Sequence, residues 1–278
     1  MIHSLIKILK LSNIIIVIIC ITTGLLAKER LILGTTTSTF DSGFIDYIRD
    51  NFEKKYNYSL HSIAQGTGQI INTAKQGNID VLITHYRPYE EIFIKNGFGI
   101  KRYNLMYNDF VIIGPKDDPA KIKNKNDLKL VMNDISQSNS IFVSRSDNSG
   151  THLKELELWS FSNIKVESLG NNYKKIGSGM GHTLNFTNSI KGYTISDRST
   201  WLSFNNKKNI QILFEGHEKL RNQYAIIIVD PKNKNNKNFE RAKIFVQWLL
   251  SSEGKEIINN FFVNNQQLFF FNGESYKE

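Results

Sequence analysis

Residues 31–39 read LILGTTTST, so that an apolar run ends at a glycine and passes directly into hydroxyl side chains. Apolar positions with helical spacing follow over Phe44–Tyr56, and Ser59–Ile63 has the pattern of a second strand. A further helix is expected from Gly66 to about Gly77, and Asp80–Thr84 has the character of a buried strand. Because strands and helices alternate in this way, we expect an α/β fold with a largely parallel sheet.

Two later apolar runs mark where we expect the chain to cross between two lobes. Phe110–Gly114 and Tyr224–Val229 are each followed closely by a proline, and the segment between them has strand and helix patterns of its own. This predicts a discontinuous first lobe, residues 28–113 and 222–278, and an inserted second lobe, residues 114–221. The apolar spacing over Phe239–Phe262 predicts an amphipathic helix that packs back on the first lobe.

The amino terminus has the pattern of an export signal. Lys7 and Lys10 form a basic flank, residues 11–27 carry no charge, and Ala27 is a small residue suited to cleavage. The apolar core is short for a membrane span, which needs about 20 residues, and an uncleaved anchor is the alternative. We therefore expect a signal peptide at residues 1–27 and a periplasmic or otherwise extracytoplasmic protein. Cleavage would remove Cys20, the only cysteine, and would leave no disulfide and no thiolate metal ligand.

The net charge of +9 suits an anionic partner. The lysines, however, are scattered among asparagines and form no dense basic block interleaved with aromatic residues. We therefore interpret most of them as a solvated surface, and we do not expect the protein to bind nucleic acid.

Three segments rich in hydroxyls and glycine each lie between an expected strand and an expected helix: Gly34–Thr39, Gly66–Gln69 and Ser144–His152. Helix amino termini expose unpaired N–H groups and a partial positive charge, so they bind anions readily. In open α/β sheets such loops gather at the carboxyl ends of strands, where ligands bind. Arg145 adds a full positive charge in a fork geometry suited to oxyanions. These segments therefore predict an anion site.

Each segment also has a purely structural interpretation. Thr36–Ser38 resembles an ordinary helix N-cap, and Gly66–Gly68 alone lacks the third glycine of a dinucleotide loop and the GK[ST] of a P-loop. The segment Arg145–Thr151 is more specific, because a strand seldom leads an arginine into a hydroxyl-rich helix start. Gly177–Gly181 is either a fourth contact or a tight turn before the helix that contains Leu184.

Several motifs in order along the chain resemble the periplasmic tungstate-binding protein family, from about Leu31 to about Arg198. They are Thr35–Ser38, Gly66–Gln69, Met106–Phe110 with Gly114–Pro119, Ser144–His152 with Lys154–Leu156, Gly179–Gly181 with Thr183–Leu184, and Tyr193–Thr194 with Asp197–Arg198. The resemblance implies a two-lobed type II periplasmic-binding-protein fold of the α/β class, with the ligand in the interlobe cleft. It also implies a monomer that binds tungstate or molybdate and delivers it to the membrane permease and ATPase of an ABC transporter.

The family's oxyanion contacts correspond to a short set of positions, and neither a cofactor nor a metal cation is implied. The positions are Thr36, Thr37, Ser38, Gly66, Thr67, Arg145, Ser149, Gly150 and Thr151. The chain departs from the family where Ser146 replaces the usual glycine, Asn148 the usual aspartate, and Tyr86, after His85, the usual alanine. We expect the nearby Arg87 to be a surface residue.

Three rival functions stay open at this point. Arg145–Thr151 is also similar to the loop of phosphate-binding receptors. An exported enzyme is the second rival, but no HExxH, paired-cysteine or GxSxG pattern singles out a catalytic set, so we expect no enzyme. The third is the ligand-sensing domain of a regulator. A phosphate receptor and a tungstate receptor lead to opposite expectations for Asp147, because a carboxylate that faces the ligand would accept the proton of phosphate. We expect the carboxylate to orient Arg145 instead, which would leave only hydrogen-bond donors around the ligand and favour tungstate over phosphate.

Overall fold

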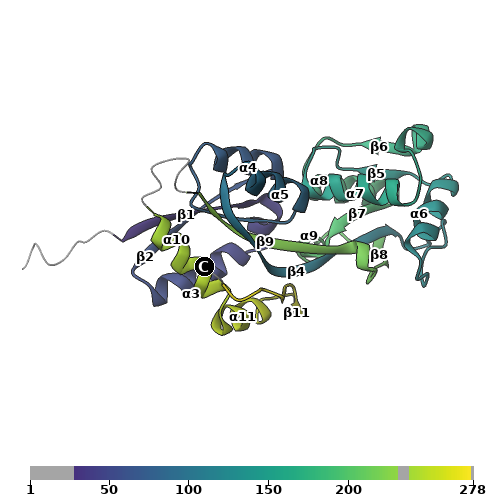
Figure 1. Cartoon of the computed structure of the whole chain (residues 1–278). Coiled ribbons are helices and arrows are strands. Elements are labelled where there is room, and N and C mark those ends of the chain that lie inside the picture. Colours follow the sequence, from purple (N-terminus) through teal and green to yellow (C-terminus); the bar gives the residue numbers. More distant parts are fainter. Residues whose placement is uncertain (1–27, 231–237, 277–278) are drawn as a thin grey trace, which may run out of the picture.

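The computed structural model describes residues 28–230 and 238–276, so the expected signal peptide, with Cys20, lies outside them. Within these residues, no helix has the length and apolar character that a membrane span requires. Figure 1 shows two halves side by side, joined by the long strands β4 (Gly99–Pro115) and β9 (Arg221–Val229). The α/β class is confirmed.

The larger sheet has the order β12-β4-β9-β3-β1-β2. β1 (Glu29–Thr36) runs parallel to β2 (Tyr58–Gln65) and β3 (Val81–Thr84), but β9 is antiparallel to β3 and β4, and β12 (Phe270–Phe271) is antiparallel to β4. The prediction of a largely parallel sheet is therefore wrong outside the βαβ units at the amino-terminal end. A parallel strand needs a crossover connection, whereas β9 returns from the other half of the molecule and enters the sheet in the opposite direction.

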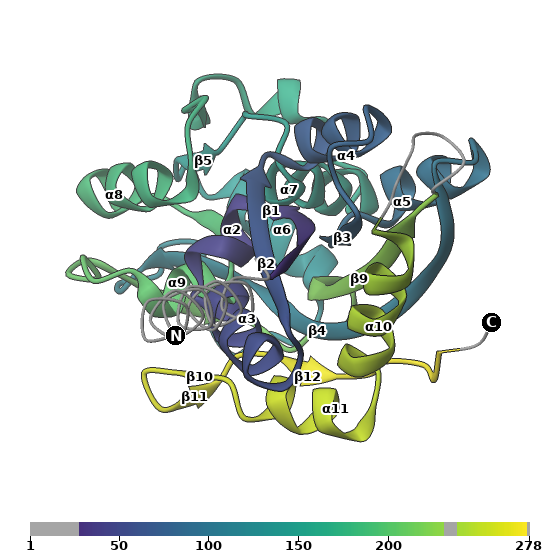
Figure 2. The same ribbon diagram turned by 90° about the vertical axis from the view of Figure 1, so that its left-hand side faces the viewer.

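Helices cover both faces of this sheet (Figure 2). They are α3 (Phe44–Lys55) and α10 (Phe239–Leu249) on one face and α4 (Thr67–Lys75) and α5 (Arg87–Lys95) on the other. Successive residues of β3 alternate between the two cores: Val81 and Ile83 pack with α3, and Leu82 packs with α4. Because both faces are buried there, β3 and residues 225–229 of β9 are apolar nearly throughout and show no alternation of apolar and polar residues.

The carboxy-terminal segment forms two helices where one was predicted over residues 239–262. α10 ends at Leu249, and α11 (Ser252–Asn259) begins after Ser251, whose backbone is extended and whose hydroxyl accepts a hydrogen bond from Gly254 N at 3.4 Å. Gly254 lies against the end of α10, because a Cβ atom there would come within 2.3 Å of the Leu249 carbonyl oxygen. The N-cap at Ser251 and the missing side chain at Gly254 therefore make the turn between the helices.

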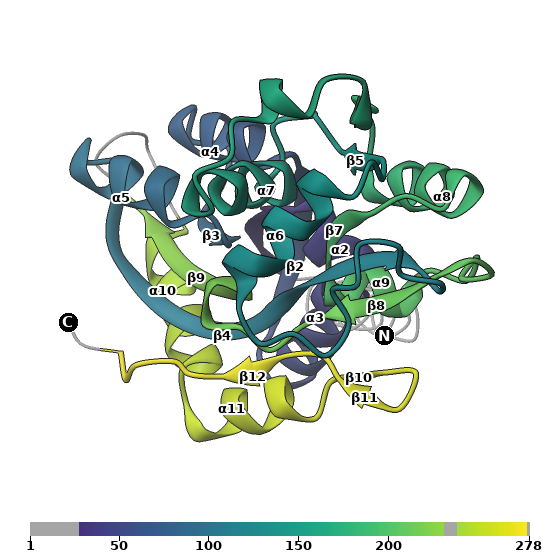
Figure 3. The ribbon, with the colours of Figure 1, turned by 90° about the vertical axis from the view of Figure 1, so that its right-hand side faces the viewer.

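β4 continues into the second half of the molecule, where it pairs with β7 (Thr194–Asp197) and β8 (Ile210–Phe214) (Figure 3). A second, parallel pair consists of β5 (Phe142–Ser144) and β6 (Tyr173–Lys175). The helices of this half are α6 (Leu128–Gln137), α7 (Gly150–Phe161), α8 (Met180–Ile190) and α9 (Arg198–Ser203). The remaining short elements are α2 (Thr37–Asp41), 3-10 turns at Val166–Asn172 and Glu218–Leu220, β10 (Phe262–Val263) and β11 (Gln266–Gln267).

The sheet register brings the hydroxyl-rich loops to one edge. β1, β2 and β3 are parallel, with Thr36 opposite Gln65 and Thr35 opposite Ile83, so their carboxyl ends lie side by side. The start of α7 comes to this edge from the other half, where Gly150 N donates a hydrogen bond to Thr67 Oγ1 at 3.2 Å. The edge of the larger sheet and the start of α7 thus meet between the two halves.

Candidate anion-binding site

A small enclosed pocket lies where the two halves meet, with a free volume of about 10 Å³. This is about the space of one water-sized sphere, so the pocket has no room for a peptide or a nucleotide. All of the predicted contact positions line it, together with one residue that was not predicted. The lining residues are Thr36, Thr37, Ser38, Gly66, Thr67, His85, Arg145, Ser149, Gly150 and Thr151.

Three helices begin at this pocket: α2 at Thr37, α4 at Thr67 and α7 at Gly150. Their first N–H groups have no partner within the helix and carry a partial positive charge. The side chain of Thr36 makes no capping hydrogen bond to α2, which argues against the N-cap interpretation of this residue. Ser149 does cap α7, by accepting a hydrogen bond from His152 N at 3.4 Å. The pocket therefore collects backbone donors from three directions.

Arg145 supplies a full positive charge to the pocket. Its side chain is buried, and its Nη2 donates to Asp147 Oδ2 at 2.5 Å, which confirms the predicted pairing of these residues. Its Nε has no hydrogen-bond partner within the described chain, so at least this donor is available to a ligand. A buried donor without a partner is costly, and a bound anion would satisfy it.

The loop that carries Arg145 depends on an ionised Asp147. Burial alone would raise the pKa of this carboxyl, but the hydrogen bonds from Ser149 and the charge of Arg145 outweigh burial and lower the pKa. One of the hydrogen bonds runs from Ser149 N to Asp147 Oδ1 at 3.2 Å. The loop also places Ser146 in the left-handed region, with φ +50°, where an L residue is disfavoured. This conformation gives a physical reason for the glycine that the resembling family has at this position.

The pocket lining contains no carboxylate. Hydroxyls can donate or accept, and backbone N–H groups and the guanidinium can only donate. Such a set of groups suits an anion that carries no proton of its own, because every ligand oxygen can then accept a hydrogen bond. Asp147 faces Arg145 and is absent from the lining, so it does not place an acceptor against the ligand.

Sequence reasoning did not select His85 as a contact, although it follows a predicted strand directly. It comes after the carboxyl end of β3, the edge where the other loops lie, and this position was the available signal. Its Nδ1 lies 2.9 Å from Asn222 Oδ1 and its Nε2 lies 3.2 Å from Thr36 Oγ1. Burial lowers the pKa of His85, more than the hydrogen bond to Asn222 and the charges of Asp197 and Glu90 raise it, so the ring is neutral near pH 7.

Gly177–Gly181, considered as a fourth contact, does not line the enclosed pocket, and only its part Gly179–Gly181 comes near. It lines an adjoining hollow of about 330 Å³ together with Thr37, Ser38 and Arg145. The start of α8 therefore borders the approach to the pocket and not the pocket itself. Arg87 is a surface residue, as predicted: its side chain is 72% exposed and pairs with Glu91 at 2.6 Å.

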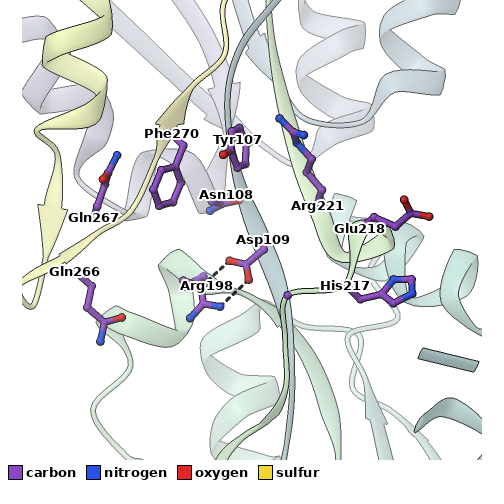
Figure 4. Close-up of a pocket in the computed structure, with 11 residues that line it drawn as sticks. Tyr107, Asn108, Asp109, Arg198, His217, Glu218, Arg221, Gln266, Gln267 and Phe270 are labelled. Atoms are coloured by element: carbon purple, nitrogen blue, oxygen red, sulfur yellow. Dashed lines mark hydrogen bonds and ion pairs between the residues drawn. The ribbon is translucent and has the colours of Figure 1, made fainter. Parts of the chain in front are cut away.

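A larger hollow of about 510 Å³ lies along β4 and β9, beside Phe270 (Figure 4). It contains Arg198, but both ends of this guanidinium bond to Asp109, at 2.6 Å each, and Nη2 also bonds to Glu215. Two carboxylates therefore neutralise the charge of Arg198. The enclosed pocket, with a donor still free on Arg145, is the better anion site.

Comparisons with known proteins show the fold and the family of this chain. The profile of the PBP superfamily domain matches residues 24–253. The tungstate-binding protein TupA of Peptoclostridium acidaminophilum is 41% identical over 237 residues, which are 84% of this chain and 82% of that protein. The solved structure of the tungstate-binding protein TupA of Desulfovibrio alaskensis G20 is 36% identical with a TM-score of 0.81, over 88% of this chain and 100% of that one. The structure described as the tungstate ABC transporter of Geobacter sulfurreducens is 38% identical with a TM-score of 0.76, over 84% of this chain and 99% of that one.

Proposed function

The chain belongs to the periplasmic-binding-protein (PBP) superfamily and, within it, to the tungstate-binding proteins, and from this premise we propose that it captures tungstate, or the similar molybdate, for an ABC importer. It acts as a two-lobed extracytoplasmic receptor and not as an enzyme. It needs no cofactor, because hydrogen bonds and one guanidinium charge suffice to hold a small oxyanion. It works as a monomer that passes the oxyanion to a membrane permease driven by an ATPase.

The observation that carries this proposal is the composition of the enclosed pocket. Backbone donors from three helix starts, hydroxyls and the buried Arg145 surround a space for one compact ligand, and no carboxylate faces it. Tungstate and molybdate are fully deprotonated dianions near neutral pH, so each of their oxygens accepts hydrogen bonds and none donates. The donors of the pocket and the acceptors of these ions are therefore complementary.

Phosphate is the alternative ligand, and Asp147 argues against it. Phosphate keeps a proton near neutral pH, and a receptor that prefers it gains from an acceptor that faces this proton. The carboxylate of Asp147 is instead engaged by Arg145 and by Ser149 N. Sulfate has the same charge as tungstate but is a smaller tetrahedron, so it reaches fewer of the donors at once and binds more weakly.

Closure of the two lobes completes the site. In this proposal the first lobe comprises residues 28–113 and 222–278, and the second comprises residues 114–221. Thr36–Ser38 and Thr67 then belong to the first lobe, and Arg145 and Gly150–Thr151 belong to the second. The hydrogen bond from Gly150 N to Thr67 Oγ1 joins the two sets. A ligand that contacts both favours the closed state, because these contacts are lost when the lobes separate.

Calorimetric titration of the purified mature chain with tungstate, molybdate, sulfate and phosphate tests the function. We expect tight binding of tungstate and molybdate, weak binding of sulfate and little binding of phosphate. Tight phosphate binding would replace this proposal with a phosphate receptor, and no binding of any oxyanion would reject it. Amino-terminal sequencing of the exported protein tests the location, with Lys28 expected near the start and a retained Met1 in the membrane fraction indicating an anchor.

A further inference from the structure

His85 is held by residues of the two strands that join the halves of the molecule. Asn108 of β4 and Asn222 of β9 are register partners. The Asn222 amide nitrogen donates to Asn108 Oδ1 at 2.8 Å and to Tyr224 Oη at 3.1 Å, so both of its hydrogens are used. Its oxygen, which can only accept, lies 2.9 Å from His85 Nδ1. In this arrangement His85 carries its proton on Nδ1.

The position of this proton determines what Thr36 can do. A neutral imidazole with a proton on Nδ1 has an acceptor at Nε2, and Nε2 lies 3.2 Å from Thr36 Oγ1. Thr36 therefore donates its single hydroxyl hydrogen to His85. The Thr36 oxygen still accepts hydrogen bonds, with Thr39 Oγ1 at 2.7 Å and Ser38 Oγ at 3.3 Å. The Thr36 hydroxyl thus organises its neighbours, and its hydrogen is not available to the anion.

The ring of His85 is also the surface against which the first residue of α7, Gly150, packs. It stacks on Tyr224 with a centroid distance of 4.8 Å and an interplanar angle of 23°. A Cβ atom at Gly150 would lie 3.0 Å from His85 Cε1 and 3.4 Å from Thr67 Oγ1. Because Tyr224 holds one face of the ring and hydrogen bonds hold both of its nitrogens, the ring cannot easily give way. A side chain at residue 150 would press on this ring, so the glycine lets the start of α7 lie directly against it.

We propose that His85 is a positioning residue of the anion site. Asn222 holds it with Nδ1 protonated, its Nε2 accepts a hydrogen bond from the Thr36 hydroxyl, and its ring is the surface that Gly150 contacts when the two lobes close. The proposal rests on the proposed function. It assigns a role to a residue that the oxyanion itself need not touch, and it links the strands between the lobes to the site. The Gly150 backbone is outside the left-handed region, so an alanine there adds no backbone strain, and its tightest contact is with the His85 ring.

The test is a double-mutant cycle with tungstate as the probe. Gly150→Ala should weaken tungstate binding by about tenfold or more, since overpacking a closed contact is costly. The matched control is Gly68→Ala, in the first turn of α4, where the new Cβ lies 3.8 Å from Tyr89 in ordinary contact; it should change affinity by less than about twofold. In the His85→Ala background the ring is absent, and Gly150→Ala should then cost less than about twofold. An undiminished loss in that background would overturn the proposal.

Two further measurements keep the test decisive. Nitrogen-15 NMR of the wild type should show the proton of His85 on Nδ1, and a proton on Nε2 would overturn the assignment of the Thr36 hydrogen. If His85→Ala does not fold, small-angle scattering compares the two glycine variants. Tungstate should lower the radius of gyration of Gly68→Ala and not that of Gly150→Ala. An equal decrease in both would overturn the proposed role of the contact between Gly150 and the His85 ring. Wild-type titration comes first, because absence of tungstate binding there rejects the proposed function while the NMR result still tests His85.

Discussion

Replacing Arg145 with alanine should weaken tungstate binding severely. The guanidinium is buried, with a relative exposure of 7%, and at least its Nε is free to bond a ligand. A charge-assisted hydrogen bond is worth roughly 1.5–3 kcal/mol. The substitution also leaves Asp147 without its cation next to the pocket, so an unpaired carboxylate would add repulsion to the lost bond. Together these effects predict a loss of about 2–4 kcal/mol, or roughly 30-fold to several hundred-fold in Kd.

Related substitutions separate the two contributions. Arg145→Lys should fall between the wild type and the alanine variant, because an ammonium keeps the charge but lacks the planar fork. Asp147→Asn should cost only a few-fold, since it loosens Arg145 without removing the charge. Combining Arg145→Ala with Asp147→Asn should bind tungstate better than Arg145→Ala alone, because the unpaired carboxylate is gone.

Calorimetry at one pH and one ionic strength measures this series, with Arg87→Ala as the matched control. That variant removes the same charge from an exposed side chain that pairs with Glu91 on the surface, so it should bind like the wild type. Wild-type affinity in Arg145→Ala would place the anion elsewhere. Equal losses in Arg145→Ala and Arg87→Ala would mean that net charge, and not the pocket, determines the binding.

Three other outcomes follow from the same structure. Burial raises the pKa of Glu155 from 4.5 to about 7, even though Tyr173 donates a hydrogen bond to it, so the folded state prefers the protonated acid. The folded state therefore loses about 3 kcal/mol of stability as the pH rises from below 4.5 to above 7. In denaturant unfolding, the free energy of unfolding of Glu155→Gln should rise relative to that of the wild type between pH 4.5 and pH 8, and an unchanged difference between the two proteins would refute the shift. Thr67→Val removes the acceptor of Gly150 N and should weaken tungstate binding by about fivefold or more, mainly through faster dissociation in stopped-flow traces; an unchanged dissociation rate would contradict this. Tungstate should lower the radius of gyration of the wild type in small-angle scattering, and an unchanged profile at saturation would count against lobe closure.

Much of the site was predictable because its parts are local in the sequence. Each hydroxyl-rich loop lies between an apolar strand and an amphipathic helix, and the rule that parallel strands share a carboxyl edge brings such loops together. The pairing of Arg145 with Asp147 was also predictable, since only one residue separates them. The confinement of these positions to one pocket also needs the second half of the molecule, because the start of α7 reaches the edge of the larger sheet from there.

The elements that the sequence did not predict depend on where the chain returns. β9 is antiparallel to its neighbours because it comes back from the second half, and no periodicity within Arg221–Val229 records its direction. The break between α10 and α11 depends on the closeness of Gly254 to the end of α10. In both cases the local pattern of apolar residues is compatible with more than one arrangement of the strand or helix in space.

The sequence by itself determined the α/β class, the oxyanion chemistry and nearly all of the residues that line the pocket, because each strand, hydroxyl-rich loop and helix start is a pattern of residues close together in the chain. Only the tertiary structure decided the role of His85. Its tautomer depends on Asn222, which is 137 residues away, and its contact with the second half depends on a missing side chain at Gly150. Such contacts exist only after β4 and β9 have brought distant segments together, so no local pattern of residues predicts them.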